Sequence, residues 1–267
     1  MDLQLTGKRA IVTGGSRGIG KAIARVLASE GASVALVARS QDTLYATAGE
    51  LAEATGQHIV AIPADTGDDA SVRAMVEQAV AELGGVDILV NCAAQPGGQG
   101  GVPSLEEIDG ETHFWPDMNV KVLGYLRTAQ AVAPHMKAAG WGRIINISGL
   151  AARQAGSTIG SMRNVAVAAL TKNLADELGP HGINVTVVHP GITRTEATAG
   201  VVARRAQSTG ATPEEIEQRM AEGNSVRTLI DAEDIAYIVA MLASPRSIAI
   251  NGDAIAAGGG APKAIHY

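Results

Sequence analysis

The fold is decided by Thr13-Gly14-Gly15-Ser16-Arg17-Gly18-Ile19-Gly20, a glycine-rich stretch that follows an apolar run and opens a helical one. Residues 8–12 predict a short buried strand, and residues 21–31 carry apolar side chains at helical spacing. The glycines therefore lie on a turn between a strand and a helix. Glycine adopts backbone angles closed to other residues and lets a phosphate approach the free N–H groups of a helix N-terminus. The stretch predicts a dinucleotide-phosphate site, and an ordinary tight turn is the alternative interpretation.

The composition is that of a globular α/β protein with a sizeable core. The chain has 267 residues, of which 46% are hydrophobic and 18% charged. A net charge of −6 without any Lys/Arg run argues against nucleic acid or an anionic membrane as partner. Cys92 is the only cysteine, which excludes an intrachain disulfide and fits a reducing compartment. Because no apolar run approaches the roughly twenty residues of a membrane helix and no signal segment opens the sequence, we expect a cytoplasmic protein.

Strand and helix patterns alternate along the chain at spacings of about 25 residues, which is typical of right-handed βαβ units. Further strands are expected at 32–38, 58–62, 86–90, 143–147, 183–188 and 250–256. Helices are expected at 43–55, 69–83, around 119 up to 140, 163–178 and 231–242. We therefore predict one domain over residues 1–267, a three-layer doubly wound parallel sheet covered by helices on both faces.

Two segments depart from this alternation. The glycine-rich segment 95–103 predicts a mobile loop. Residues 192–230 form a long polar insertion in which one helix is expected at 213–222, and we expect this insertion to be the lid over the substrate site. Its apolar and basic residues allow an apolar pocket with a basic rim, and they are Val201, Val202, Arg204, Arg205, Ile216 and Met220.

Several motifs in the same order resemble the short-chain dehydrogenase/reductase family over nearly the whole chain. The glycine loop has that family's spacing, the segment 91–94 follows the fourth strand, and the segment 190–195 follows the sixth. The remaining matches are Asp65, Asn119, Asn251-Gly252-Asp253 and Gly258-Gly259. The resemblance implies a Rossmann fold, a nicotinamide-dependent oxidoreductase acting on a small molecule, and a homotetramer or homodimer.

The resemblance also implies which residues contact the cofactor. Those at the pyrophosphate and adenosine phosphate would be Gly14, Ser16, Arg17, Gly18, Ile19 and Gly20. Asp65 and Thr66 would contact the adenine, and Asn91 and Ala93 the ribose. Ile192 and Thr195 would contact the nicotinamide amide, in the turn that also holds Pro190 and Gly191.

The end of the second strand selects the dinucleotide. An acidic side chain there would accept a hydrogen bond from the ribose 2′-hydroxyl and repel a 2′-phosphate, but this chain has Ala38-Arg39-Ser40. Arg39 and Arg17 can clamp a dianionic phosphate with charge-assisted hydrogen bonds. We predict NADP(H) in preference to NAD(H), with a solvated strand end as the alternative role of Arg39.

The chain departs from the family in its catalytic residues. The family uses a tyrosine, a lysine four residues later, a serine at the end of the fifth strand and an asparagine in the fourth helix. Aligned from the strands on either side, this chain has Gly160 at the tyrosine position, Asn164 at the lysine position and Gly149 at the serine position, one residue after Ser148. Loss of a general acid typically removes 10²–10⁴-fold of rate. Asn119 and Ser148 remain as the candidate catalytic residues.

No nearby residue restores the missing pair in sequence. The tyrosines are Tyr45, Tyr125, Tyr237 and Tyr267, and none lies between Ser148 and Lys172. The other polar candidates, each with a structural alternative, are Arg153, Ser157, Ser161, Arg163 and His189. Cys92 is interpreted as a small buried hydrophobe, and Tyr267 as a residue able to reach a neighbouring subunit.

The chain combines the cofactor motifs of the family with replaced catalytic residues, and three hypotheses follow from this combination. The first is an NADP(H)-dependent oxidoreductase with an atypical proton route. The second is a nucleotide-binding sensor or partner subunit without turnover. The third is a non-redox enzyme on the same scaffold, such as a hydrolase or dehalogenase; the dehalogenase branch loses the cofactor loop and keeps serine and tyrosine, the reverse of the pattern here.

Overall fold

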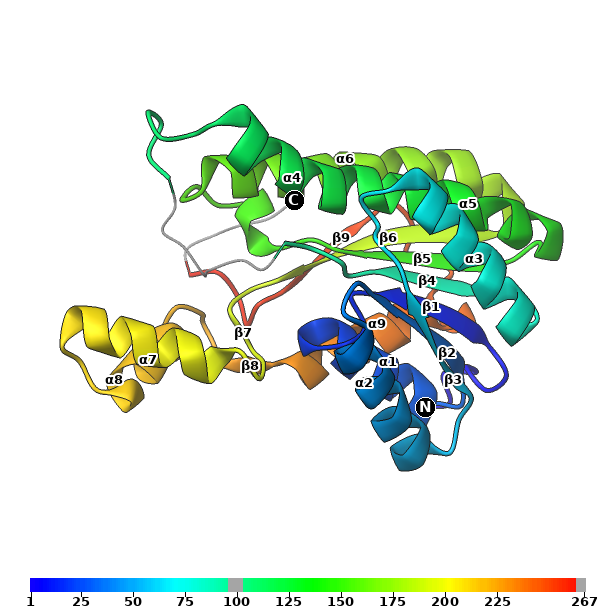
Figure 1. Cartoon of the computed structure of the whole chain (residues 1–267), viewed down its shortest axis with the longest axis horizontal. Helices are drawn as coiled ribbons and strands as arrows, with labels where there is room; N and C mark the ends of the chain where they lie inside the picture. Colours follow the sequence, from blue (N-terminus) through cyan, green and yellow to red (C-terminus); the bar gives the residue numbers. More distant parts are fainter. Residues whose placement is uncertain (96–102, 263–267) are drawn as a thin grey trace.

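Seven parallel strands form one sheet in the computed structural model, which describes residues 1–95 and 103–262. The strands lie in the order β3-β2-β1-β4-β5-β6-β9 (Figure 1). Their bounds are β1 (Arg9–Thr13), β2 (Ser33–Ala38), β3 (Ile59–Pro63), β4 (Ile88–Asn91), β5 (Gly142–Ile147), β6 (Ile183–Pro190) and β9 (Ala254–Ala257). This order and the helices on both faces confirm the predicted doubly wound Rossmann fold.

Each face of the sheet is covered by its own group of helices (Figure 1). The helices α1 (Gly18–Ser29), α2 (Gln41–Thr55) and α9 (Ala232–Ala243) pack on one face, and α3 (Asp69–Leu83), α5 (Gly124–Ala139) and α6 (Thr158–Leu178) on the other. Along β1, Val12 belongs to the first core and Ile11 to the second, because successive side chains of a strand point to opposite faces.

The helix that precedes β5 is irregular. It consists of a π-helical turn η1 (Gly110–Phe114), α4 (Trp115–Met118), a second π-helical turn η2 (Asn119–Leu123) and then α5. A π turn holds more residues than an α turn, so the side chains within η2 do not follow the α-helical face before it. This irregularity decides where Asn119 and Lys121 point.

The insertion holds two helices rather than the one that the sequence predicts. After β7 (Thr193–Arg194) come α7 (Thr198–Thr209) and α8 (Pro213–Ala221), followed by β8 (Ile230–Asp231). The two helices protrude from the body in Figure 1, and they enclose a small core of Val202, Ile216, Met220 and Leu229. The prediction missed α7 because this helix, without a side-chain cap, depends on packing against α8.

Two predicted boundaries are also wrong. Helix α6 begins at Thr158 rather than at residue 163, because Ser157 caps it by accepting a hydrogen bond from the Gly160 N–H. Strand β9 begins at Ala254 rather than at residue 250, because Gly252 adopts a positive φ of 77° and forms a turn. The predicted loop at 95–103 lies largely outside the described residues. Within the described part of the chain, no helix is both long and apolar enough to cross a membrane.

Candidate functional site

The glycine loop forms a cradle between the ends of β1 and β4. Gly14 has a φ of 68°, and a Cβ there would lie 2.9 Å from the Cys92 carbonyl oxygen. A Cβ at Gly20 would lie 2.2 Å from the Gly14 carbonyl oxygen. The Thr13 hydroxyl accepts hydrogen bonds from the N–H groups of Cys92 and Ala93, at 3.1 and 3.2 Å. These close backbone contacts require glycine at both positions and fix the path of the loop into the N-terminus of α1, whose free N–H groups can receive a dinucleotide phosphate.

A carboxylate already lies at the N-terminus of α1. The Gly18 N–H donates a hydrogen bond of 2.7 Å to Oε1 of Glu196, although 178 residues separate the two in sequence. The neighbouring Thr195 methyl lies 3.6 Å from the position that a Cβ of Gly18 would take. Helix N-termini attract anions, so the Glu196 carboxylate lies where a negative charge is favoured. The sequence reasoning missed Glu196, although it adjoins the predicted residue Thr195.

The residues predicted for the adenosine end surround the ends of β2 and β3. Arg17 and Arg39 are exposed, and neither forms an ion pair with any described carboxylate. Ser40 follows as the N-cap residue of α2. The Asp65 carboxylate accepts a hydrogen bond of 2.9 Å from the Gly67 N–H, and the adjacent Thr66 is buried. Two guanidinium groups are thus available to a dianion.

The side chain of Asn91 is used inside the protein. Its Nδ2 donates to Oδ1 of Asn146 at 3.0 Å, and its Oδ1 accepts from the Thr128 hydroxyl at 2.7 Å. Asn146 in turn donates to the Thr171 hydroxyl at 2.9 Å. This buried polar chain joins β4 and β5 to the helices above them. Because the Asn91 amide is used in these internal bonds, a ribose at this position could contact only the backbone and Ala93.

A cavity of about 440 Å³ lies beyond the C-terminal ends of β5 and β6. Ligands of doubly wound sheets bind at this end of the strands. Its wall brings together predicted cofactor residues, the predicted catalytic serine and the insertion, namely Ile19, Ser148, Gly149, Asn164, Pro190, Gly191, Ile192, Met220 and Asn224. Of the residues predicted for the cofactor and for catalysis, the lining includes Ile19, Ser148, Pro190, Gly191 and Ile192.

Glycines stand at the positions assigned to the family's serine and tyrosine; Gly149 lines the cavity, whereas Gly160 is not among its lining residues. A Cβ at Gly149 would lie 3.0 Å from Nδ2 of Asn164, and a Cβ at Gly160 would lie 2.8 Å from the Ser157 hydroxyl oxygen that caps α6. The Ser148 hydroxyl donates a hydrogen bond of 3.2 Å to the Asn164 carbonyl oxygen. Besides the Ser148 hydroxyl and the Asn164 amide, which do not titrate near neutral pH, the lining of the cavity includes Gln154 and Arg163.

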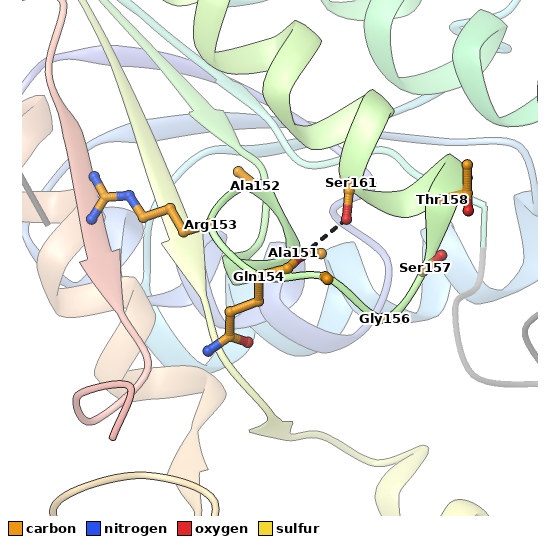
Figure 2. A pocket seen from close by; sticks show the side chains of 9 residues that line it. Ala151, Ala152, Arg153, Gln154, Gly156, Ser157, Thr158 and Ser161 are labelled. Carbon is orange, nitrogen blue, oxygen red and sulfur yellow. Dashed lines mark hydrogen bonds between the residues drawn. The ribbon is translucent and has the colours of Figure 1, made fainter. Parts of the chain in front are cut away.

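A second, more open pocket of about 660 Å³ lies beside this wall (Figure 2). It is lined by residues 151–158 and Ser161. The Ser161 hydroxyl donates to the Gln154 carbonyl oxygen at 3.0 Å (Figure 2). Arg153 donates to the Ala254 carbonyl oxygen at 2.9 Å. These bonds, with the cap made by Ser157, give the three candidates structural roles in the segment between β5 and α6.

The structure does not bring Asn119 and Ser148 together. Nδ2 of Asn119 donates to the Gly67 carbonyl oxygen at 3.1 Å, on the side of Asp65. Lys121 lies at Ser148 instead: its Nζ donates to the Ser148 carbonyl oxygen at 3.0 Å, and the residue is 4% exposed. Sequence reasoning missed Lys121, whose only signal is a single cation between apolar neighbours in a helical segment.

Electrostatics set Lys121 apart from its neighbours. Burial, and secondly the nearby Arg163 guanidinium, lower the pKa of Lys121 to about 7. Burial raises the pKa of the Cys92 thiol to about 11, so Cys92 is not a nucleophile at neutral pH. Burial also raises the pKa of Tyr125, whose hydroxyl donates to the Ile147 carbonyl oxygen.

The remaining charged candidates have partners. Arg163 binds both carboxylate oxygens of Asp117, at 2.6 and 2.7 Å. Lys172 is exposed and pairs with Asp176 at 2.6 Å. His189 is buried in β6, and Tyr267 lies outside the described residues.

Comparisons with known proteins agree with this geometry. Residues 8–206 match the family described as short chain dehydrogenase. The short-chain reductase protein NovJ of Streptomyces niveus is 35% identical over 254 residues, which cover 95% of this chain and 93% of NovJ. The L-sorbose reductase of Gluconobacter frateurii, solved in complex with NADPH and L-sorbose, superposes with a TM-score of 0.91 at 30% identity, covering 99% of this chain and 100% of that one. A short chain dehydrogenase from Burkholderia cenocepacia in complex with NADP superposes with a TM-score of 0.81 at 33% identity, covering 96% and 98%.

Proposed function

The chain belongs to the short-chain dehydrogenase/reductase family, and we propose that it is an NADP(H)-binding oxidoreductase that interconverts a carbonyl and an alcohol by an atypical proton route. The observation that carries this proposal is that the glycine loop and the cavity form one continuous site. The glycine cradle at α1 continues through Ile19 into the cavity that Ser148 and Ile192 line. The NADPH-bound sorbose reductase of the same fold supports the choice of cofactor class.

Residues of this chain would hold the dinucleotide at three points. The backbone of the loop from Gly14 to Gly20 would receive the pyrophosphate, and the unpaired guanidinium groups of Arg17 and Arg39 would receive the 2′-phosphate. The segment from Pro190 to Thr195 would hold the nicotinamide end beside the cavity. When bound, the dinucleotide supplies or accepts the hydride, while the protein positions it.

The protein's own contribution at the cavity is positioning. Ser148 would donate a hydrogen bond to the substrate oxygen, since its hydroxyl is otherwise bonded only to a backbone carbonyl. Met220 and Asn224 bring the insertion into the cavity wall, which supports a lid role for residues 192–230. We take the tetrad as degenerate, with Gly160 and Asn164 at the tyrosine and lysine positions.

A second candidate function is a nucleotide-binding sensor or partner subunit without turnover. One observation favours it. Gly160, at the tyrosine position, is buried, and the Ser157 hydroxyl that caps α6 lies where a larger side chain would have to fit. The two functions share the cofactor site and differ at the cavity.

The test is a titration with NADPH and NADH, followed by a screen of carbonyls and alcohols for change in the nicotinamide absorbance band. We expect tighter binding of NADPH and turnover of at least one substrate class. Tight binding without turnover across the panel would favour the non-catalytic function. Failure to bind either nucleotide would contradict the interpretation of the glycine loop as a dinucleotide site.

A further inference from the structure

Lys121 is a buried cation without a carboxylate partner among the described residues. It is 4% exposed, and its Nζ makes one hydrogen bond, to the Ser148 carbonyl oxygen at 3.0 Å. A buried, unpaired ammonium is costly, and such a group tends to become neutral. It also lies in the π-helical turn η2, a distortion that frequently occurs at functional sites.

The charged and titratable groups around Lys121 come from three elements. Cys92 follows β4, Asp117 lies in α4 and Arg163 lies in α6. Asp117 is held by Arg163 through two short hydrogen bonds, so its charge is largely neutralised. The Arg163 guanidinium disfavours the charged form of Lys121, and burial does so more strongly. The amine and ammonium forms are therefore both accessible near neutral pH.

Ser148 connects this lysine to the cavity. The carbonyl oxygen of Ser148 holds the ammonium, and the same residue lines the cavity wall next to Asn164. Lys121 does not itself line the cavity. Ser148 carries both the carbonyl oxygen that accepts from Nζ and the hydroxyl, which donates to the Asn164 carbonyl oxygen. A proton passes from Lys121 to this hydroxyl only after a rotation of the lysine side chain carries Nζ from the carbonyl oxygen to the hydroxyl oxygen.

We propose that Lys121 supplies the proton for the substrate oxygen through the Ser148 hydroxyl. Lys121 does not touch the substrate itself. This inference rests on the proposed function, with a reduced nicotinamide dinucleotide as the hydride source. It gives the site the proton donor that Gly160 and Asn164 cannot provide.

In the reduction, a C–H bond forms at the carbonyl carbon with the transferred hydride, and the π electron pair of the carbonyl moves onto the oxygen. The Ser148 O–H bond breaks, and its proton forms the new O–H bond of the alcohol. The serine oxygen takes a proton from the Lys121 ammonium, which becomes an amine and is recharged by a proton from solvent water.

The first measurement needs no turnover. In protein labelled with ¹³C at the lysine ε carbons, we expect one signal to titrate near pH 7 and to vanish in Lys121→Met. The exposed lysines should titrate near their usual pKa of about 10.4. Lys172→Met serves as the matched control, because Lys172 is exposed and paired with Asp176. A Lys121 signal that titrates near the usual value would overturn the proposal.

The second measurement is the pH profile of kcat/KM for reduction. Since the ammonium is the active form, the wild-type rate should be constant below about pH 7 and fall about tenfold per pH unit above it. Lys121→Met should lose on the order of 10²-fold and this pH dependence, with NADPH affinity retained. Lys121→Arg, which keeps a cation that does not titrate, should also lose the dependence. Thermal unfolding establishes that each variant is folded.

If the wild type turns over and Lys121→Met keeps its rate and pH profile, the proton role is wrong and the oxidoreductase function stands. If the wild type binds NADPH but turns over no substrate, the oxidoreductase function is wrong and the proton role falls with it, whatever pKa the lysine has.

Discussion

Glu196 is expected to compete with the dinucleotide for the N-terminus of α1. Its carboxylate accepts the Gly18 N–H at 2.7 Å. If the pyrophosphate binds this loop as we propose, it displaces the carboxylate. An anion at an exposed helix N-terminus contributes about 0.3–1 kcal/mol. Repulsion between two unit charges about 4 Å apart in water adds about 1 kcal/mol. Glu196→Gln removes the charge but keeps an acceptor oxygen, so NADPH should bind about tenfold more tightly, since about 1.4 kcal/mol corresponds to a factor of ten.

The assay is a fluorescence titration with NADPH at low and high salt. The gain should shrink as salt rises, because the contact is exposed and screened. Glu214→Gln is the matched control, because it makes the same charge change on α8 with an exposed side chain. Equal or weaker NADPH affinity in Glu196→Gln would refute the competition, as would an equal gain in Glu214→Gln.

Three further predictions concern other parts of the site. Arg39→Asp should weaken NADPH binding roughly tenfold and shift the preference toward NADH, because it replaces a charge-assisted donor with a carboxylate that repels the 2′-phosphate. Unchanged affinities for both nucleotides would show that Arg39 does not select the cofactor. Gly14→Ala should lower the free energy of unfolding by about 1–3 kcal/mol more than Gly56→Ala, since both glycines have positive φ but only Gly14 has an atom in the way, the Cys92 carbonyl oxygen at 2.9 Å; equal losses in chemical denaturation would mean that the cradle is not tight. For Lys121, the folded-state pKa is lowered from 10.5 to about 7, so between these values the unfolded chain binds a proton that the folded chain does not. Wild-type stability should therefore rise with pH through this window, by on the order of 5 kcal/mol relative to Lys121→Met, and parallel stability curves of the two proteins would count against the lowered pKa.

The sequence predicted those features that depend on local periodicity. The glycine loop, the apolar strands and the strongly amphipathic helix α1 are recognisable locally, and the order of strands and helices along the chain predicts the sheet. Helix α7 was missed because its stability comes from contacts with α8 across the insertion. Propensity within the segment alone carries little of that information.

The candidate site was predicted only where motifs lie at strand ends. Ser148, Ile192 and Gly191 are in the cavity wall because the ends of β5 and β6 are neighbours in the sheet. Lys121 could not be assigned, since the π turn η2 directs it to Ser148 and directs Asn119 to Gly67. The consequences of a helix irregularity for side-chain direction are not visible in the spacing of residues.

Glu196 escaped prediction for a different reason. Its contact with Gly18 joins residues 178 positions apart, and it depends on the path of the chain after β6. No local pattern marks an acidic residue as the partner of a distant helix N-terminus.

The most direct test of the proposed function is transfer of deuterium from NADPH labelled at the transferring position of the nicotinamide. The protein is incubated with labelled NADPH and the panel of carbonyls, and the alcohols formed are analysed by mass spectrometry. We predict one deuterium on the carbinol carbon of at least one product, with formation rate lowered in Lys121→Met. Bound NADPH with no deuterium in any product would contradict the account and identify the protein as a nucleotide-binding member of the family without redox turnover on these substrates.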